Sequence, residues 1–223
     1  MNQAPVRAVF FDVGGTLIEP WPSVGAIYAA VARRHGLTGT AEQMERAFRE
    51  SWAALKRPGL TVSRKKWWRE LVFRTLGQEN EECFAELFDL FSRASAWRVF
   101  PDVEETLREV RAHGVHIGII SNWDERLRPL LQDLGLAAWF DSATISCEVG
   151  VEKPDAAIFQ AALRLSGVPA VETVHIGDSY DEDVRGAEAI GMRAVLINRK
   201  SDDNALGCPC IRDLRSSLKF ATG

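Results

Sequence analysis

The feature of this sequence that most constrains its fold is an alternation of short apolar runs with amphipathic segments, which begins near residue 6 and resumes after residue 98. Runs of this length, rich in β-branched residues and bounded by polar residues or glycine, are typical of buried strands. They cover residues 6–11, 115–120, 143–146, 173–176 and 193–197. Strands separated by helices of about ten residues need crossover connections. The sequence therefore predicts an α/β fold with a five-stranded parallel sheet covered on both faces.

Residues 20–97 interrupt this alternation, because they have helical periodicity and contain no convincing strand. Four segments carry apolar residues on one face, and Pro58-Gly59 is a typical helix stop between two of them. Short amphipathic helices of this kind form a small bundle. The predicted domains are an α/β core of residues 1–19 and 98–223 and an inserted helical bundle of residues 20–97.

The charge balance argues against several classes of partner. The chain has 27 basic and 31 acidic residues, a net charge of −4 and no long basic run, so nucleic acid and anionic membranes are not expected as partners. The apolar stretch near the N-terminus is too short for a secretory segment, and no run reaches the roughly 18 apolar residues of a membrane span. We therefore expect a soluble, cytoplasmic protein.

The cysteines fit that expectation without indicating a function. The chain contains four, spread without a disulfide-like framework, and reduced thiols are the norm in the cytoplasm. Only Cys208-Pro209-Cys210 forms a close pair. Its spacing differs from that of zinc sites and no histidine follows it, so the sequence assigns this pair no role.

Polar side chains follow three of the predicted strands. Asp12 follows the first, Ser121-Asn122 the second and Asp178 the fourth. Ligands of parallel sheets bind outside the carboxyl ends of the strands, so these side chains are expected to converge on one crevice if their strands are neighbours. Lys153, which we expect to open a helix after Gly150, can direct a cation to the same crevice.

Two carboxylates that face each other repel, so either one is protonated or a cation lies between them. Oxygen ligands without histidine or cysteine select a hard ion such as Mg²⁺, which often completes its coordination with water and phosphate oxygens. The sequence thus predicts a combined anion and Mg²⁺ site around Asp12 and Asp178.

The order and spacing of these motifs resemble the haloacid dehalogenase-like superfamily. The four matching segments are residues 12–16, 117–121, 153–154 and 177–183. A helical insertion directly after the first motif is similar to the subfamily with an α-helical C1 cap. The resemblance implies a Rossmann-like core and a cap that selects the substrate. We expect a small phosphorylated molecule as the partner, and a protein that is a monomer or a homodimer.

The resemblance also implies roles for single residues. Asp12 would be the nucleophile that forms an aspartyl-phosphate, and Lys153 would neutralise Asp12 and the phosphate. Ser121 would donate a hydrogen bond to phosphoryl oxygens, and Thr16 and Asn122 are further substrate-binding candidates within or beside the motifs.

The same resemblance implies a metal site. Asp12, Asp178 and the backbone carbonyl of Gly14 would hold Mg²⁺, and Asp183 would be an outer or conditional ligand.

Gly14 is a departure from the phosphatase pattern. Phosphatases of the superfamily carry an aspartate two residues after the nucleophile, which protonates the leaving group and then activates water. General acid–base catalysis contributes roughly 10²–10⁴-fold, or about 3–5 kcal/mol of barrier, so its loss should slow hydrolysis of alkyl phosphates most. Glu19, just past the turn, is a candidate base on proximity alone.

Three functions follow from these residues. The first is a Mg²⁺-dependent hydrolase, specifically a phosphatase with weak or unusual activity. The second is a catalytically impaired protein of the same fold that binds a phosphorylated molecule or a protein partner. The third is a metal-independent 2-haloacid dehalogenase, which does not need the missing acid at position 14 but has no use for Asp178 in its metal-site context.

Overall fold

The computed structural model describes residues 4–55, 64–200 and 207–221. The chain divides into two compact units, one formed by Met1–Ile18 with Val99–Gly223 and the other by Glu19–Arg98. The first is the α/β core and the second is helical. The expected helix stop at Pro58-Gly59 lies outside the described residues.

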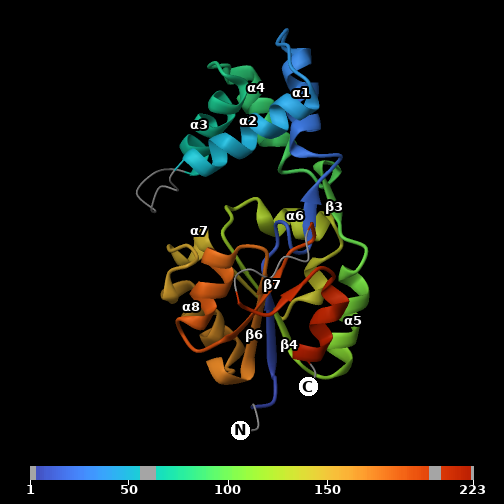
Figure 1. The fold of residues 1–223 in the computed structure, drawn as a ribbon, viewed down its shortest axis with the longest axis vertical. Coiled ribbons are helices and arrows are strands. Elements are labelled where there is room, and N and C mark those ends of the chain that lie inside the picture. The colour runs from blue at the N-terminus through green and yellow to red at the C-terminus, as the bar shows by residue number, and fades with distance from the viewer. Residues whose placement is uncertain (1–3, 56–63, 201–206, 222–223) are drawn as a thin grey trace. The chain divides into compact units, whose positions relative to one another are not determined.

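The α/β unit is built on one parallel sheet with strand order β5-β4-β1-β6-β7-β8 (Figure 1). The strands are β1 (Ala8–Phe11), β4 (His116–Ser121), β5 (Ser142–Ile145), β6 (Thr173–Gly177), β7 (Arg193–Ile197) and β8 (Cys210–Ile211). The parallel α/β architecture is therefore confirmed. The expected count of five strands is wrong, because β8 adds a sixth strand of only two residues, too short for a periodic signal.

Strand β1 lies at the centre of the sheet between β4 and β6. Each of its four residues is fully buried, and Phe11 is level with Ile119 of β4 and Ile176 of β6. This register brings the carboxyl ends of the three strands to one edge of the sheet. Asp12, Ser121 and Asp178, in or just after these strand ends, therefore lie at the same edge.

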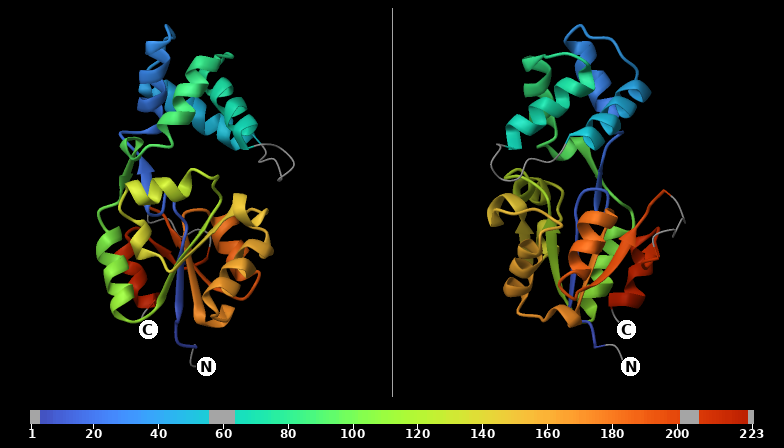
Figure 2. Two further views of the ribbon diagram at one scale, coloured as in Figure 1. Left: turned by 180° about the vertical axis from the view of Figure 1, so that it is seen from behind. Right: turned by 60° about the vertical axis from the view of Figure 1, so that its left-hand side comes forward.

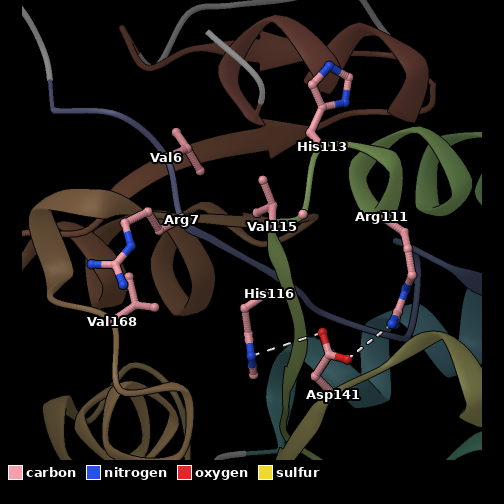
Figure 3. Close-up of a pocket in the computed structure, with 9 residues that line it drawn as sticks. Val6, Arg7, Arg111, His113, Val115, His116, Asp141 and Val168 are labelled. Carbon is pink, nitrogen blue, oxygen red and sulfur yellow. Dashed lines mark hydrogen bonds and ion pairs between the residues drawn. The ribbon is translucent and has the colours of Figure 1, made fainter.

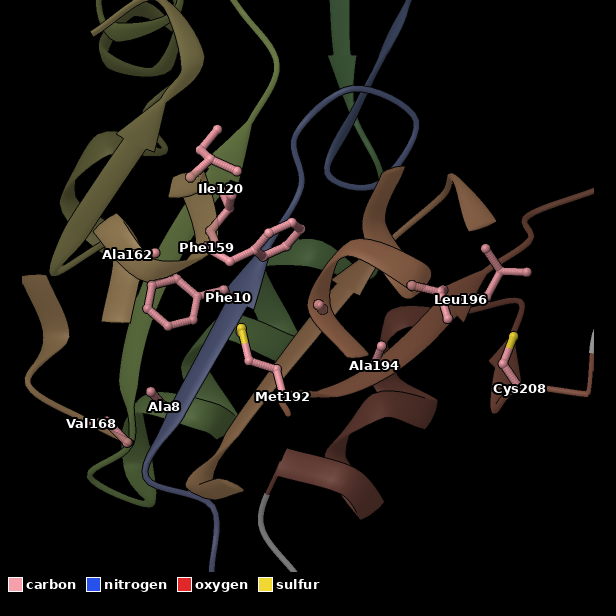
Figure 4. Packing of buried hydrophobic residues seen from close by; sticks show 13 residues of the cluster. Ala8, Phe10, Ile120, Phe159, Ala162, Val168, Met192, Ala194, Leu196 and Cys208 are labelled. Atoms are coloured by element: carbon pink, nitrogen blue, oxygen red, sulfur yellow. The ribbon is translucent and has the colours of Figure 1, made fainter. Parts of the chain in front are cut away.

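Helices cover both faces of the sheet (Figures 1 and 2). They are α5 (Val103–Ala112), α6 (Leu127–Asp133), α7 (Ser146–Val149), α8 (Ala156–Ser166), α9 (Arg185–Glu188) and α10 (Leu218–Ala221). Short 3₁₀ segments at Ala137–Trp139, Ala170–Glu172 and Leu214–Ser217 connect them, and a π-helical turn at Tyr180–Val184 precedes α9. On the face covered by α8, Phe10 of β1, Phe159 of α8 and Met192 belong to one buried cluster (Figure 4).

The helical unit contains α1 (Val24–Arg34), α2 (Ala41–Ala54), α3 (Arg64–Leu76) and α4 (Glu81–Leu90), and a 3₁₀ turn at Ala94–Ala96. Side chains of Ser23, Thr40 and Asn80 cap the starts of α1, α2 and α4, which satisfies backbone N–H groups that have no partner within the helix. The apolar faces form a separate core around the fully buried Tyr28. None of the helices in the described parts of the chain is long and apolar enough to cross a membrane.

The chain passes between the units through a two-stranded sheet of β2 (Ile18–Pro20) and β3 (Trp97–Val99). The sequence does not predict these strands, because three residues are too few to show alternation. Glu19, the candidate base, forms an ion pair with Arg98 across this sheet.

Candidate active site

Asp12 is the first residue after β1, and it is buried with 7% of its surface exposed. Its backbone N–H donates to the Ile176 carbonyl at 2.9 Å, which continues the pairing of β1 with β6 by one residue. Its Oδ1 accepts hydrogen bonds from Ser121 Oγ at 3.1 Å and from Lys153 Nζ at 2.7 Å. Asp12 and Ser121 thus meet as the sheet topology predicts, and Lys153 joins them from another part of the chain.

Lys153 supplies the buried cation of this site. It lies in the loop between α7 and α8, which begins with Gly150 in the left-handed conformation. The expectation that Lys153 opens a helix is wrong, because Asp155 caps α8 and the helix starts at Ala156. The loop carries the ammonium to within 2.7 Å of Asp12 and 2.5 Å of Asp183, with 1% of the lysine side chain exposed.

The two carboxylates determine the charge state of Lys153. Burial alone would lower the pKa of its ammonium, but Asp12 and Asp183 together raise that pKa above its ordinary value. The lysine therefore stays protonated and acts as a fixed positive charge.

Asp183 is the second carboxylate bonded to this ammonium. It belongs to the turn Tyr180–Val184, where its Oδ1 also accepts from His175 Nε2 at 2.9 Å and its Oδ2 from the Ser179 backbone N–H at 3.0 Å. Burial favours the protonated acid, but Lys153 and His175 outweigh burial and hold the pKa of Asp183 below its ordinary range. Asp183 is thus an ionised anchor for the lysine.

Asp178 is the third carboxylate, and it is exposed to solvent at the edge of the site. Atoms of the surrounding loops nevertheless crowd its carboxyl, and this desolvation, with repulsion from Asp12 and Asp183, raises its pKa to about 8. A Cβ on Gly15, whose φ is +78°, would lie 2.2 Å from Asp178 Oδ2, so only glycine fits beneath the carboxylate. Carboxylate oxygens of Asp12, Asp178 and Asp183 lie within 4.8 Å of one another.

The charges of this group suit a bound divalent cation. The carboxylates of Asp12, Asp178 and Asp183 lie together, and one lysine ammonium is bonded to two of them. Desolvation raises the pKa of Asp178, and repulsion from Asp12 and Asp183 adds to this rise. A hard cation with oxygen ligands, such as Mg²⁺, fits the donor set of the site.

The side-chain amide of Asn122 is hydrogen-bonded to other residues of the protein. Its Oδ1 accepts from the Lys153 backbone N–H at 2.7 Å, and its Nδ2 donates to the Lys153 carbonyl at 3.0 Å and to Glu182 Oε2 at 3.0 Å. The amide therefore holds the backbone that presents Lys153. Its expected role in substrate binding stays a prediction.

Thr16 is fully buried, and its expected role in substrate binding stays a prediction. Its carbonyl accepts from Arg199 Nη2 at 2.6 Å, and Arg199 also forms a two-point ion pair with the buried Asp102 at 2.9 and 3.1 Å. Its hydroxyl has no hydrogen-bond partner among the described residues. Sequence reasoning does not find this Arg199–Asp102 support of the first motif, because nothing local links residues so far apart.

Gly14 faces an aromatic ring. A Cβ added to Gly14 would lie 3.2 Å from Cζ3 and 3.9 Å from Cη2 of Trp123. Trp123 follows Ser121 and Asn122 at the end of β4, and sequence reasoning misses it because a tryptophan next to a polar motif is ordinarily read as packing. The missing acid at position 14 is therefore accompanied by an indole in the adjoining space.

A pocket of about 510 Å³ lies at the other edge of the sheet (Figure 3). Its basic residues are already engaged, since Arg7 pairs with Glu172 at 2.9 Å and Arg111 with Asp141 at 3.2 Å. It lies where β1 and β4 begin, whereas ligands of open parallel sheets bind beyond the carboxyl ends. The Asp12 site is therefore the candidate active site.

The fold and these motifs define a known family. The family model described as haloacid dehalogenase-like hydrolase matches residues 6–191. The chain belongs to the haloacid dehalogenase-like hydrolases, as the resemblance of its motifs implies.

Curated relatives extend along most of the chain. The protein from Homo sapiens named haloacid dehalogenase-like hydrolase domain-containing protein 3 is 35% identical over 209 residues, which cover 88% of this chain and 83% of that protein. Phosphoserine phosphatase from Thermus thermophilus is 31% identical over 223 residues, which cover 87% of this chain and 89% of the enzyme.

Solved structures give the same picture of the fold. A HAD phosphatase from Thermococcus onnurineus is 25% identical with a TM-score of 0.68, covering 96% of this chain and 97% of that one. A 2-haloacid dehalogenase from Pseudomonas syringae pv. Tomato DC3000 is 29% identical with a TM-score of 0.63, covering 97% of each chain. Phosphatases and dehalogenases are thus both among the structural relatives.

Proposed function

We propose that this chain is a Mg²⁺-dependent phosphatase that acts on a small phosphorylated molecule. The observation that carries the proposal is the buried ammonium of Lys153 between Asp12 and Asp183, with Asp178 as a third carboxylate beside them. A site with this charge pattern suits a phosphate and a divalent cation together. The relatives named as a phosphoserine phosphatase and a HAD phosphatase support the same reaction class.

Asp12 is the proposed nucleophile. One of its carboxylate oxygens attacks phosphorus, the bond from phosphorus to the leaving oxygen breaks, and the leaving group departs with the electron pair of that bond. Water then hydrolyses the aspartyl-phosphate, which releases phosphate and restores Asp12. Lys153 holds the Asp12 carboxylate at 2.7 Å and compensates negative charge on the phosphoryl group, and Ser121 turns its hydroxyl from Asp12 to a phosphoryl oxygen.

Asp12, Asp178 and the backbone carbonyl of Gly14 are the proposed Mg²⁺ ligands. Mg²⁺, when bound, offsets the negative charge of the transferred phosphoryl group. Asp183 suits a supporting role better than a direct one, because Lys153 and His175 occupy its Oδ1 and Ser179 its Oδ2. We therefore propose Asp12, Asp178 and the Gly14 carbonyl as direct ligands, and Asp183 as the residue that positions Lys153.

Gly14 restricts the substrates that this site can turn over. Without an acid at position 14, the leaving oxygen departs as an anion. For substrates whose leaving group needs protonation, the barrier to phosphoryl transfer is then about 3–5 kcal/mol higher. The proposed activity is therefore high on acyl and aryl phosphates relative to alkyl phosphates.

Turnover of acetyl phosphate and 4-nitrophenyl phosphate, each with Mg²⁺ and with excess chelator, tests the proposal. We expect activity on both substrates that needs Mg²⁺ and is lost in Asp12→Asn, while Asp178→Asn needs more Mg²⁺ to reach its maximum. Activity equal to that of Asp12→Asn on both substrates would refute the proposal. Arg128→Gln, which alters an exposed ion pair with Glu148, is a control expected to retain activity.

A second candidate is a protein that binds a phosphorylated ligand without turning it over, and the missing acid at Gly14 favours it. Binding of inorganic phosphate in the absence of any turnover of either substrate would support this candidate. The third function, dehalogenation, has a structural relative from Pseudomonas syringae in its favour. Release of halide from 2-chloropropionate that is insensitive to chelator would support it.

A further inference from the structure

Trp123 is the one aromatic side chain that adjoins Gly14 among the described residues. The benzo edge of its indole, Cζ3 and Cη2, faces the point from which a side chain at position 14 would project. Both are carbon atoms, so this edge donates neither a proton nor a hydrogen bond. An acid is thus missing at position 14, and an apolar ring edge lines the space beside it.

The backbone of Trp123 is held on both sides. Its N–H donates to Ser146 Oγ at 3.1 Å, and its carbonyl accepts from the same hydroxyl at 3.0 Å and from the Cys147 N–H at 3.3 Å. Ser146 is fully buried at the start of α7. Asn122, the preceding residue, is fixed by its three bonds to Lys153 and Glu182. The indole is therefore built into the same framework that places Lys153.

The indole edge beside Gly14 and the missing acid favour one kind of leaving group. A phenol has a pKa of about 10, against about 15.7 for water, so a phenolate departs without a proton far more easily than an alkoxide. A phenyl ring also packs on an indole, with a gain beyond its buried area. Both properties, the missing acid and the adjacent aromatic edge, point to the same substrates.

We propose that Trp123 determines the specificity of the Asp12 site, and that its indole binds the planar aromatic leaving group of an aryl phosphate. The inference rests on the proposed phosphatase function and adds its substrate class. Trp123 contacts the departing group, Asp12 attacks on the other side of phosphorus, and the leaving oxygen needs no proton from position 14.

The test measures binding, so that it does not depend on turnover. Benzylphosphonate has the shape of phenyl phosphate with a methylene in place of the ester oxygen, and ethylphosphonate lacks the ring. Calorimetry with Mg²⁺ present should show tighter binding of benzylphosphonate than of ethylphosphonate. Trp123→Leu should weaken benzylphosphonate by about 2- to 12-fold, the range for losing one aromatic pair, and leave ethylphosphonate unchanged.

Two variants make this comparison specific. Trp123→Phe keeps a ring and should retain most of the preference for benzylphosphonate. Trp139→Leu is the same change as Trp123→Leu at another partly buried tryptophan of the α/β unit, before β5, and should leave both affinities unchanged.

The inference is overturned if the wild-type protein does not prefer benzylphosphonate, if Trp123→Leu keeps the preference, or if it weakens both phosphonates equally. Failure of the proposed function has a different signature. In that case the preference for benzylphosphonate persists while neither phosphate ester nor acetyl phosphate is turned over above the level of Asp12→Asn.

Discussion

Replacement of Lys153 by methionine should destabilise the α/β unit strongly. The side chain of Lys153 is 1% exposed, and its ammonium is bonded to Asp12 at 2.7 Å and Asp183 at 2.5 Å. Methionine fills a similar volume but leaves two buried carboxylates without their cation. Removing one partner of a buried ion pair costs about 3–5 kcal/mol. For a chain of this size each kcal/mol lowers Tm by about 2–4 °C, so we expect a decrease of about 6–20 °C.

The matched control is Arg128→Met, which also removes a cation from a carboxylate. Arg128 bonds Glu148 at 2.5 and 2.7 Å, but about half of its side chain is exposed, with 53% accessible against 41% for Glu148. Exposed pairs contribute about 0–1 kcal/mol, so this variant should unfold within a few degrees of wild type.

Both variants are measured by thermal unfolding with chelator present, so that bound cations do not compensate for the lost ammonium. The effect of Lys153→Met should shrink as the pH falls, because the two carboxylates then take up protons. Equal, small decreases for Lys153→Met and Arg128→Met would refute the inference that Lys153 compensates a buried, ionised pair.

Four further predictions concern the surrounding residues. The pKa of Asp178 rises from 3.8 in the unfolded chain to about 8 in the folded protein, so the folded protein loses stability as the pH rises between these values. With chelator present, the Tm of Asp178→Asn should therefore be higher than that of wild type near pH 8 and equal to it near pH 4. Adding Mg²⁺ should raise the Tm of wild type more than that of Asp178→Asn, and an equal rise in both would contradict the assignment of Asp178 as a ligand. Gly14→Asp should raise the turnover of alkyl phosphates relative to aryl phosphates. The increase should be larger in combination with Trp123→Leu, because the Cβ of the new aspartate would otherwise lie 3.2 Å from the indole. Additive effects in this double-mutant cycle would show that the two positions are not coupled. Asn122→Ala should lower kcat for both acetyl phosphate and 4-nitrophenyl phosphate with a smaller change in KM, because the lost side-chain hydrogen bonds hold the Lys153 backbone. A change in KM alone would instead indicate that Asn122 contacts the substrate directly.

The parts of the site that lie at strand ends could be predicted from the sequence. Asp12, Ser121 and Asp178 follow apolar runs, and parallel strands bring their carboxyl ends to one edge. Periodicity is enough to find such runs, so the α/β architecture follows as well. The strands of two or three residues, β2, β3 and β8, carry too few side chains to show a period and are missed.

The support around these residues depends on tertiary contacts that no local pattern contains. His175 could be noticed as a polar residue inside a buried strand, but its bond to Asp183 at 2.9 Å requires the turn that follows β6. Trp123 faces Gly14 only because β4 lies next to β1. Asn122 follows Ser121, and its role in substrate binding stays a prediction. Its hydrogen bonds to the Lys153 backbone could not be predicted, because Lys153 lies in the distant loop before α8.

The most direct measurement of the central claim is capture of the phosphoryl group on Asp12. Protein mixed with acetyl phosphate and Mg²⁺ is quenched in acid, digested and analysed by mass spectrometry. We predict the mass gain of one phosphoryl group on the peptide that contains Asp12, absent in Asp12→Asn and reduced by chelator. Turnover of acetyl phosphate by wild type with no phosphoryl group on that peptide, and undiminished turnover by Asp12→Asn, would contradict the assignment of Asp12 as the nucleophile.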